Sequence, residues 1–301
     1  MSKKTSIARL SIMSNVFLII IKLIVGLIGG SVSIISEAIH STMDLVAAII
    51  AYFSVKVSDN PPDKRHPYGH GKIENISGVI EALLIFVASF WIIFEAVKKI
   101  ISKEEIDSIG LGFIVMFISC IVNILVSRKL YKVAKETDSV ALEADALHLK
   151  ADVYTSAGVG VGLLLIWITG LYFLDPIVAI IVAIFIMIEA YGMLKTAFAP
   201  LLDVNLPDNE IKTITESIQS MTWGCIDFHQ LRTRKAGNKR YVDLHLEVPQ
   251  KFTVAEAHDL CDKIEKAIEA KIPKIEIHIH VEPCPKMCDT CKSYEEFHAI
   301  S

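Results

Sequence analysis

The run VSIISEAIHSTMDLVAAIIAYFSVKV, residues 32–57, is long and apolar enough to cross a lipid bilayer as one helix. A spanning helix needs about 20 residues, because each residue advances the helix by only about 1.5 Å. Within the run, His40 and Asp44 lie four residues apart and therefore share one helix face. Ionisable residues are costly inside a bilayer and are usually functional there. The run thus predicts a membrane helix that carries a chemical site.

A second apolar run repeats the same pattern. Residues 144–152 read ADALHLKAD, which places His148 and Asp152 at the same spacing. One such pair alone is equally well explained as a polar contact inside a helix bundle. Two identical pairs in separate runs favour a shared metal site, because facing each other they supply two imidazoles and two carboxylates. That set of four ligands suits tetrahedral Zn²⁺.

Apolar runs of this length fill the first 200 residues, and 52% of the whole chain is hydrophobic, more than is usual for a soluble protein. Six runs cover residues 8–30, 32–57, 76–97, 109–126, 140–168 and 176–199. Only helices and closed barrels satisfy the backbone polar groups in lipid, and these runs are too long for barrel strands. The sequence therefore predicts a multi-pass α-helical membrane protein with six transmembrane helices.

Basic residues gather before the first run and in the loops that follow the second and fourth runs. They are Lys3, Lys4, Arg9, Lys64, Arg65, Arg128, Lys129, Lys132 and Lys135. Loops rich in Lys and Arg stay in the cytoplasm. With six spans, both termini are then expected to be cytoplasmic and the protein to reside in the cell membrane. We see no basic stripe that would favour nucleic acid as a partner.

After the last run, the composition becomes that of a soluble domain. We expect a helix from Pro207 to about Met221 and a helix at 254–271 capped by Thr253. Strands are expected at residues 226–235, 240–248 and 274–281. The order α-β-β-α-β predicts an α+β domain with a small open sheet and helices on one face. The predicted domains are residues 1–203, 204–283 and a cysteine-containing tail at 284–301.

Two further clusters could bind metal. In the loop DKRHPYGHGK, residues 63–72, Asp63, His66 and His70 could hold a cation, although a solvated basic loop explains them equally well. In the second predicted domain, strands and a helix could bring ligands together at one edge, although histidines scattered over a surface are also common. These ligands are His229, His245, His258, His280 and Glu282.

The tail carries Cys284, Cys288 and Cys291. Their C-x-x-x-C-x-x-C spacing would suit a soft metal such as Zn²⁺ or Cu⁺, and a reduced mobile tail is the alternative. Three thiols so close together favour metal or thiol chemistry in a reducing compartment over a disulfide framework.

On these residues the chain resembles the cation diffusion facilitator family and is similar to its bacterial ferrous-iron and zinc efflux proteins. The likeness rests on the two H-x-x-x-D pairs and on short motifs elsewhere. These motifs are GSVSI at 30–34, HGK at 70–72, LRTR at 231–234 and HVEPC at 280–284. The resemblance implies six spans, a cytoplasmic ferredoxin-like domain, a homodimer and proton-coupled efflux of Zn²⁺ or a related cation.

The resemblance also implies roles for the candidate residues. It makes His40, Asp44, His148 and Asp152 the transport site, the loop cluster a second metal site, and the cluster of the second domain a cytoplasmic binuclear site. Zn²⁺ is then the transported substrate and a regulatory ligand. His40 stands where many bacterial relatives carry Asp, which favours Zn²⁺. Glu282 stands where a bacterial relative has Asp.

The expected function is therefore a Zn²⁺/H⁺ antiporter that exports zinc from the cytoplasm, with protons competing for the imidazoles. One alternative is an exporter of Cd²⁺, Co²⁺, Fe²⁺ or Mn²⁺ with the same mechanism. The other is a membrane metal sensor that transports nothing. An enzyme is not expected, because a four-ligand set leaves no open metal position for catalysis.

Overall fold

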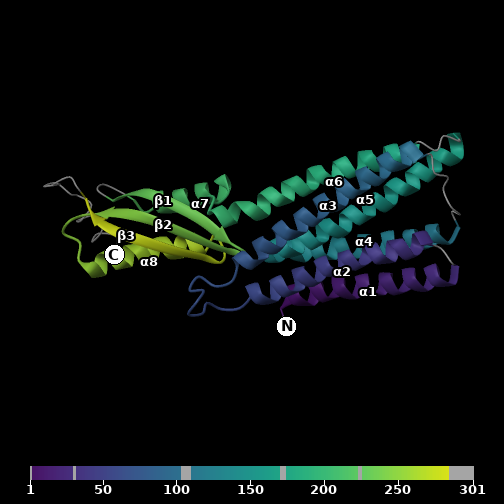
Figure 1. The fold of residues 1–301 in the computed structure, drawn as a ribbon. Coiled ribbons are helices and arrows are strands. Elements are labelled where there is room, and N and C mark those ends of the chain that lie inside the picture. The colour runs from purple at the N-terminus through teal and green to yellow at the C-terminus, as the bar shows by residue number, and fades with distance from the viewer. Residues whose placement is uncertain (1, 30–31, 103–109, 170–173, 223–225, 285–301) are drawn as a thin grey trace. The chain divides into compact units, whose positions relative to one another are not determined.

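The chain folds into two compact units, which we call the helical unit, residues 1–199, and the C-terminal unit, residues 200–301 (Figure 1). Each is described by itself. The computed structural model describes residues 2–29, 32–102, 110–169, 174–222 and 226–284.

Six long helices make up the described part of the helical unit. They are α1 (Lys3–Gly29), α2 (Val32–Ser58), α3 (Lys72–Ser102), α4 (Gly110–Thr137), α5 (Val140–Thr169) and α6 (Leu174–Phe198). Every apolar run of the sequence forms one of these helices, as predicted. The largest difference is in α4, which continues for about three turns beyond its apolar run and so carries the basic residues that follow it.

Three of these helices are long and apolar enough, within the described residues, to cross a membrane. The stretches are Lys3–Val25, Lys72–Lys98 and Pro176–Leu202. Large apolar side chains on them point outward, with Trp91 and Ile188 each 66% exposed. Outward apolar groups of this size need lipid or protein around them.

The helix α5 is central to the helical unit, because it packs against α2, α3, α4 and α6. Its approach to α3 and α6 is close at Gly78. A Cβ added to Gly78 would lie 3.0 Å from Ala197 Cβ and 3.0 Å from Val140 Cγ1. Small residues that let helix backbones approach are typical of membrane helix packing. This packing brings side chains of α5 to within reach of α2 and α3.

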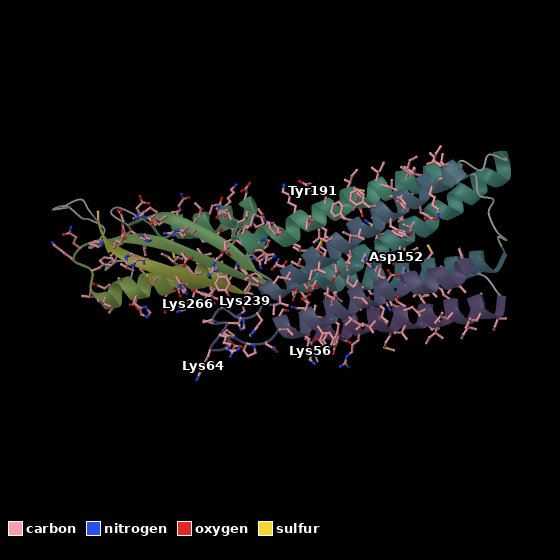
Figure 2. All side chains as sticks on the ribbon, viewed as in Figure 1. Lys56, Lys64, Asp152, Tyr191, Lys239 and Lys266 are labelled. Atoms are coloured by element: carbon pink, nitrogen blue, oxygen red, sulfur yellow. The ribbon has the colours of Figure 1, made fainter. Side chains whose placement is uncertain are left out.

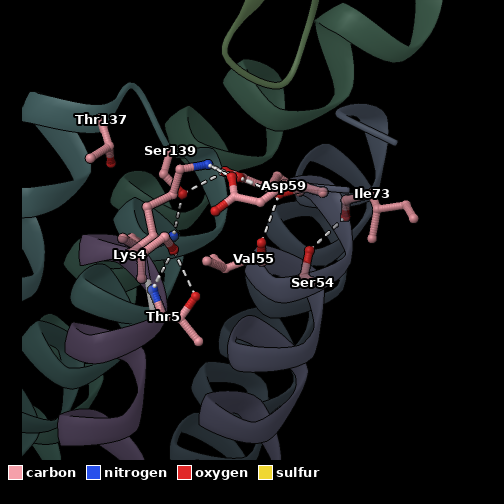
Figure 3. Close-up of polar contacts among 12 residues, drawn as sticks. Lys4, Thr5, Ser54, Val55, Asp59, Ile73, Thr137 and Ser139 are labelled. Carbon is pink, nitrogen blue, oxygen red and sulfur yellow. Dashed lines mark hydrogen bonds and ion pairs between the residues drawn. The ribbon is translucent and has the colours of Figure 1, made fainter. Parts of the chain in front are cut away.

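One end of the helical unit is held by a polar group that we call the Glu74 cluster, formed by Lys4, Ser58, Asp59, Glu74 and Ser139 (Figure 3). Glu74, at the start of α3, is 1% exposed. Its Oε1 accepts hydrogen bonds from Lys4 Nζ at 2.7 Å and Ser58 Oγ at 2.7 Å, and its Oε2 accepts one from Ser139 Oγ at 2.5 Å. Lys4 Nζ also lies 2.8 Å from Asp59 Oδ1. The cluster therefore joins the starts of α1 and α3 to the end of α2 and the residue before α5.

The C-terminal unit is an α+β fold with the predicted order α-β-β-α-β. Its elements after the short 3₁₀ helix η1 (Ala199–Leu202) are α7 (Asp208–Gln219), β1 (Asp227–Ala236), β2 (Lys239–Val248), α8 (Val254–Glu269) and β3 (Ile275–Pro283). The sheet has the order β1-β2-β3, with β1 antiparallel and β3 parallel to β2. A capping box between Thr253 and Glu256 begins α8, as the predicted cap requires.

Both helices of this unit cover one face of the sheet. Val242, Leu244 and Leu246 of β2 share a buried core with Ile218 of α7 and Ile264 of α8. Alternation along a strand sends the residues between them to the opposite face. That opposite face is where the polar side chains of the sheet gather.

A β-bulge interrupts the pairing of β1 with β2. His229 pairs with His245, but Arg232 pairs with Asp243, so β1 carries one extra residue between the two pairs. Gln230 lies in this bulge and has φ 52°, a left-handed backbone conformation that residues other than glycine rarely adopt.

Candidate metal sites

The first candidate site lies inside the helical unit between α2 and α5. Asp44 is 7% exposed and His148 is 8% exposed. His148 Nε2 lies 3.1 Å from Asp44 Oδ1, and Asp152 offers an oxygen within 4.8 Å of ligand atoms from both. Figure 2 places Asp152 among the helices of this unit. Ligands about 2.0–2.1 Å from a tetrahedral Zn²⁺ are about 3.3 Å apart, so this group is close to metal-binding geometry.

Hydrogen bonds from α1 position the part of α2 that carries this site. Asn15 Nδ2 donates to the backbone oxygen of Asp44 at 3.3 Å, and Lys22 Nζ donates to Ser41 Oγ at 2.8 Å. Lys22 is buried, and its contact with Ser41, three residues before Asp44, places its charge on the same part of α2. The fourth expected ligand, His40, belongs to α2, but its side chain lies outside the described part of the structure.

The second candidate site is the loop between α2 and α3. Asp63 Oδ1 lies 3.2 Å from His66 Nδ1, and Asp63 Oδ2 lies 3.3 Å from His70 Nε2. Hydrogen bonds from the backbone N–H groups of His66 and Arg65 lower the pKa of the Asp63 carboxyl. The carboxylate is therefore ionised well below neutral pH and available to a cation. The structure brings all three predicted residues together, with Asp63 and His66 more than half exposed.

The third candidate site lies on the sheet face opposite the helices of the C-terminal unit. His229, His245 and His280 form one row across the three strands, because His229 pairs with His245 and His245 pairs with His280. Glu282 reaches back to this row. Its Oε1 is 2.8 Å from His245 Nδ1, and its Oε2 is 3.4 Å from His229 Nε2. His229, His245 and Glu282 thus form a group with metal-binding spacing.

The structure places the other two predicted residues of this cluster differently. His280 Nε2 lies 3.5 Å from Glu282 Oε1, at the border of the group, and its side chain is 67% exposed. His258 belongs to α8, which packs on the other face of the sheet, and there it lies 3.8 Å from Asp262. The structure of a single chain therefore does not bring His258 to the group.

The tail cysteines are described only at Cys284, whose side chain is buried at the end of β3. Cys288 and Cys291 lie outside the described residues.

Several acidic residues near these sites are not assigned a role by the sequence. Glu247 Oε1 lies 3.6 Å from His229 Nδ1, and its position two residues after His245 on the same strand is the signal that could have found it. Glu81 of α3 and Asp145 of α5 are buried in the helical unit with 0% and 1% exposure. In a helix that is apolar on all sides, the sequence does not tell which side faces the interior of the bundle.

Both units of the chain match parts of known proteins. Residues 8–202 match the family model of the cation efflux transmembrane domain, and residues 206–284 match that of the cytoplasmic domain of cation efflux proteins. An uncharacterized transporter of Synechocystis is 36% identical over 256 residues, covering 85% of this chain and 83% of that protein. The cation-efflux pump FieF of Escherichia fergusonii is 30% identical over 278 residues, covering 92% of each chain.

Among solved structures, the chain is similar to the metal-bound C-terminal domain of the CzcD transporter from Thermotoga maritima. The identity is 28%, with 27% of this chain and 99% of that chain covered and a TM-score of 0.24. The family assignment depends on the two family models and the full-length relatives. With matches that extend from residue 8 to residue 284 and relatives similar over most of their length, the chain is a membrane protein of the cation diffusion facilitator family, a family of cation efflux transporters.

Proposed function

We propose that this transporter is a Zn²⁺/H⁺ antiporter that exports zinc from the cytoplasm. The observation that carries the proposal is the buried contact between His148 and Asp44, with Asp152 beside it. A neutral imidazole and two carboxylates match the charge of a dication, whereas the same carboxylates without a cation are costly to bury.

Nitrogen and oxygen ligands in a tetrahedral set favour Zn²⁺ among common divalent ions. His40 lies one helical turn before Asp44 and would complete this set as the fourth ligand. With two imidazoles in the set, harder ions such as Mn²⁺ and Fe²⁺ are less favoured. Cd²⁺ and Co²⁺ are the alternative substrates that share this ligand preference.

Protons provide the coupling in this proposal, because the ligands bind metal only when deprotonated. A site open to the cytoplasm takes Zn²⁺ and releases protons, and a site open to the other side takes protons and releases Zn²⁺. Helices that carry the site rock between the two states. The cytoplasmic clusters, by binding Zn²⁺, act as regulatory sites that bias this equilibrium.

We further propose six membrane spans, cytoplasmic termini and a homodimer. Lys3 in α1 pairs with Glu136 at the end of α4, and the Glu74 cluster joins the corresponding ends of α2, α3 and α5. These contacts place Lys3, Lys4 and the basic end of α4 at one end of the helical unit, as the positive-inside rule expects for a cytoplasmic side. The match to the cytoplasmic domain of this family supports the same orientation.

Flux into proteoliposomes tests this function. Full-length protein should take up Zn²⁺ across an imposed pH gradient, and D152N should lose this flux while remaining folded and monodisperse. D259N, which neutralises an exposed carboxylate on α8, serves as the matched control and should transport normally. Unchanged flux in D152N would reject the assigned site.

The same assay separates the competing function of a sensor. A sensor needs the exposed clusters but no ion movement, so it would bind Zn²⁺ and show no flux in wild type. The buried group at His148 favours transport, because a site meant only to sense cytoplasmic metal has no need of ligands inside the bundle.

A further inference from the structure

Two carboxylates in the helical unit are unexplained by the proposed transport site. Glu81 of α3 is 0% exposed and Asp145 of α5 is 1% exposed. Neither oxygen of Asp145 has a hydrogen-bond partner among the described residues, and neither has Glu81 Oε2. Native proteins almost always satisfy such buried oxygens. Buried ionisable groups in membrane helices are rare and mark ion or proton pathways.

The surroundings of this pair hold hydroxyl groups and little positive charge. Ser77 Oγ donates to Glu81 Oε1 at 3.1 Å, one turn earlier on α3. Ser11 of α1 lies close enough to Asp145 to act on its carboxylate, but the two do not meet the geometry of a hydrogen bond. Hydroxyl groups can serve a protonated or an ionised carboxyl equally well, since they both donate and accept.

The charged groups that act on this pair are few. Asp145 and His148 act on Glu81, and His148 acts on Asp145. The nearby cations have other partners. Lys150 of α5 pairs with Glu189 of α6 at 3.0 Å, and Lys22 of α1 bonds Ser41 of α2.

Lys4, at the start of α1, also has carboxylate partners, because it pairs with Glu74 and Asp59. On α2, Asp44 contacts His148. Two buried carboxylates without a dedicated cation are best accommodated when they hold a proton.

We propose that Glu81 and Asp145 form a proton-binding site that is linked electrostatically to the transport site through His148. The pair stands apart from the metal ligands, because Asp145 lies nearly one turn before His148 on α5 and Glu81 belongs to a third helix. This inference rests on the proposed antiport function and names a group that carries a proton for it.

The linkage follows from charge. When Zn²⁺ enters the group of Asp44, His148 and Asp152, the added positive charge favours the ionised form of the nearby carboxyl pair. The pair then loses its proton to water on the side to which the bundle is open. When Zn²⁺ leaves, the positive charge is gone and the pair takes up a proton from water again. No bond other than the O–H bond forms or breaks.

Proton release on metal binding tests the proposal directly. Zn²⁺ is added to purified full-length protein in weak buffer, and a pH dye reports the protons released per ion bound. E81Q keeps the shape and the Ser77 contact but cannot ionise, so it should release fewer protons than wild type, by up to about one. E81D, which remains ionisable, should restore the release. E95Q changes another carboxylate of α3, four turns away, and is the matched control.

Flux measurements separate this proposal from the antiport proposal. D152N should lose Zn²⁺ flux altogether, whereas E81Q should keep downhill Zn²⁺ flux and lose much of its acceleration by a pH gradient. D145N should behave like E81Q, which keeps the test available if one variant fails to fold. Unchanged proton release and unchanged pH dependence in a folded E81Q or D145N would overturn the proposal. So would loss of a bound Zn²⁺ from E81Q, because Glu81 would then be a metal ligand.

Discussion

His148 Nε2 and Asp44 Oδ1 lie 3.1 Å apart in the folded protein, although 104 positions separate the two residues in the chain. The contact joins α2 to α5 inside the helical unit, at a place where both side chains are buried. An imidazole and a carboxylate held in this way can share either a proton or a metal ion.

Removing one charge from this contact should weaken metal binding. We expect D44N to lower the affinity of the helical unit for Zn²⁺ by at least about tenfold, since an amide is a poor ligand for this ion. Titration against a competing chelator measures the change, with D259N as the control. An affinity equal to that of wild type would show that Asp44 is not a ligand.

The row of histidines across the sheet predicts that two histidine substitutions in the C-terminal unit have different effects on metal content. H245A should remove one bound Zn²⁺ from the full-length protein, because His245 is the central member of the row. H258A should leave the number of bound ions unchanged, because His258 lies on the other face of the sheet. Elemental analysis after gel filtration gives both numbers. Loss of an ion in H258A would mean that a second copy of the chain supplies this residue.

The Glu74 cluster should contribute strongly to stability. E74Q leaves Lys4 buried with Asp59 as its remaining carboxylate partner, and breaking a buried ion pair typically costs about 3 kcal/mol. We therefore expect a lower unfolding temperature in detergent, followed by circular dichroism. The double variant K4Q/E74Q should recover part of the loss, because it no longer buries an underpaired charge. Equal unfolding temperatures for E74Q and wild type would contradict this expectation.

The thiol of Cys261 should be unreactive near neutral pH. Burial on the inner face of α8, together with the nearby carboxylates of Glu265 and Asp262, raises the pKa of Cys261 to about 11. Only the thiolate reacts with iodoacetamide, so alkylation at pH 8 should be about a hundredfold slower than for an ordinary thiol. Peptide mass mapping assigns the label to Cys261, and a denatured sample is the positive control. Equally fast labelling of the native protein would disprove the raised pKa.

The raised pKa of Cys261 also makes the stability of the folded protein depend on pH. The folded state holds the Cys261 proton up to about pH 11, whereas the unfolded thiol loses it near its usual value of 9.0. Between these values the folded state binds more protons, so this thiol lowers stability as pH rises through that window. Below pH 9 both states hold the proton, so this thiol adds no pH dependence to the stability. A C261S variant should show a smaller loss of stability between pH 9 and pH 10.5.

The elements of the fold were predictable from the sequence because their signals are local. An apolar run of about 20 residues specifies a helix in lipid, and the alternation of apolar and polar residues in 240–248 specifies a half-buried strand. The proximity of Asp63, His66 and His70 was also predictable, because they are close in sequence and a turn brings them together.

The arrangement of distant residues could not be obtained in this way. Spacing places His148 and Asp152 on one face of α5, but it does not say which neighbour that face meets. The register of β1, β2 and β3 decides that His229, His245 and His280 form a row and that His258 is excluded, and one bulge residue changes that register. Burial of Glu81 and Asp145 depends on how three helices pack, which a linear pattern does not contain.

The near-complete burial of Asp44 and His148 has a kinetic consequence. An ion bound at the exposed loop can exchange its ligands for water one at a time, so it can bind and dissociate without rearrangement of the protein. An ion held between α2 and α5 has no such route while the helices stay packed. Under the proposed function, its dwell time is set by how often the bundle opens. The turnover number of the transporter should then follow helix motion rather than the rate at which the metal ion exchanges its ligands.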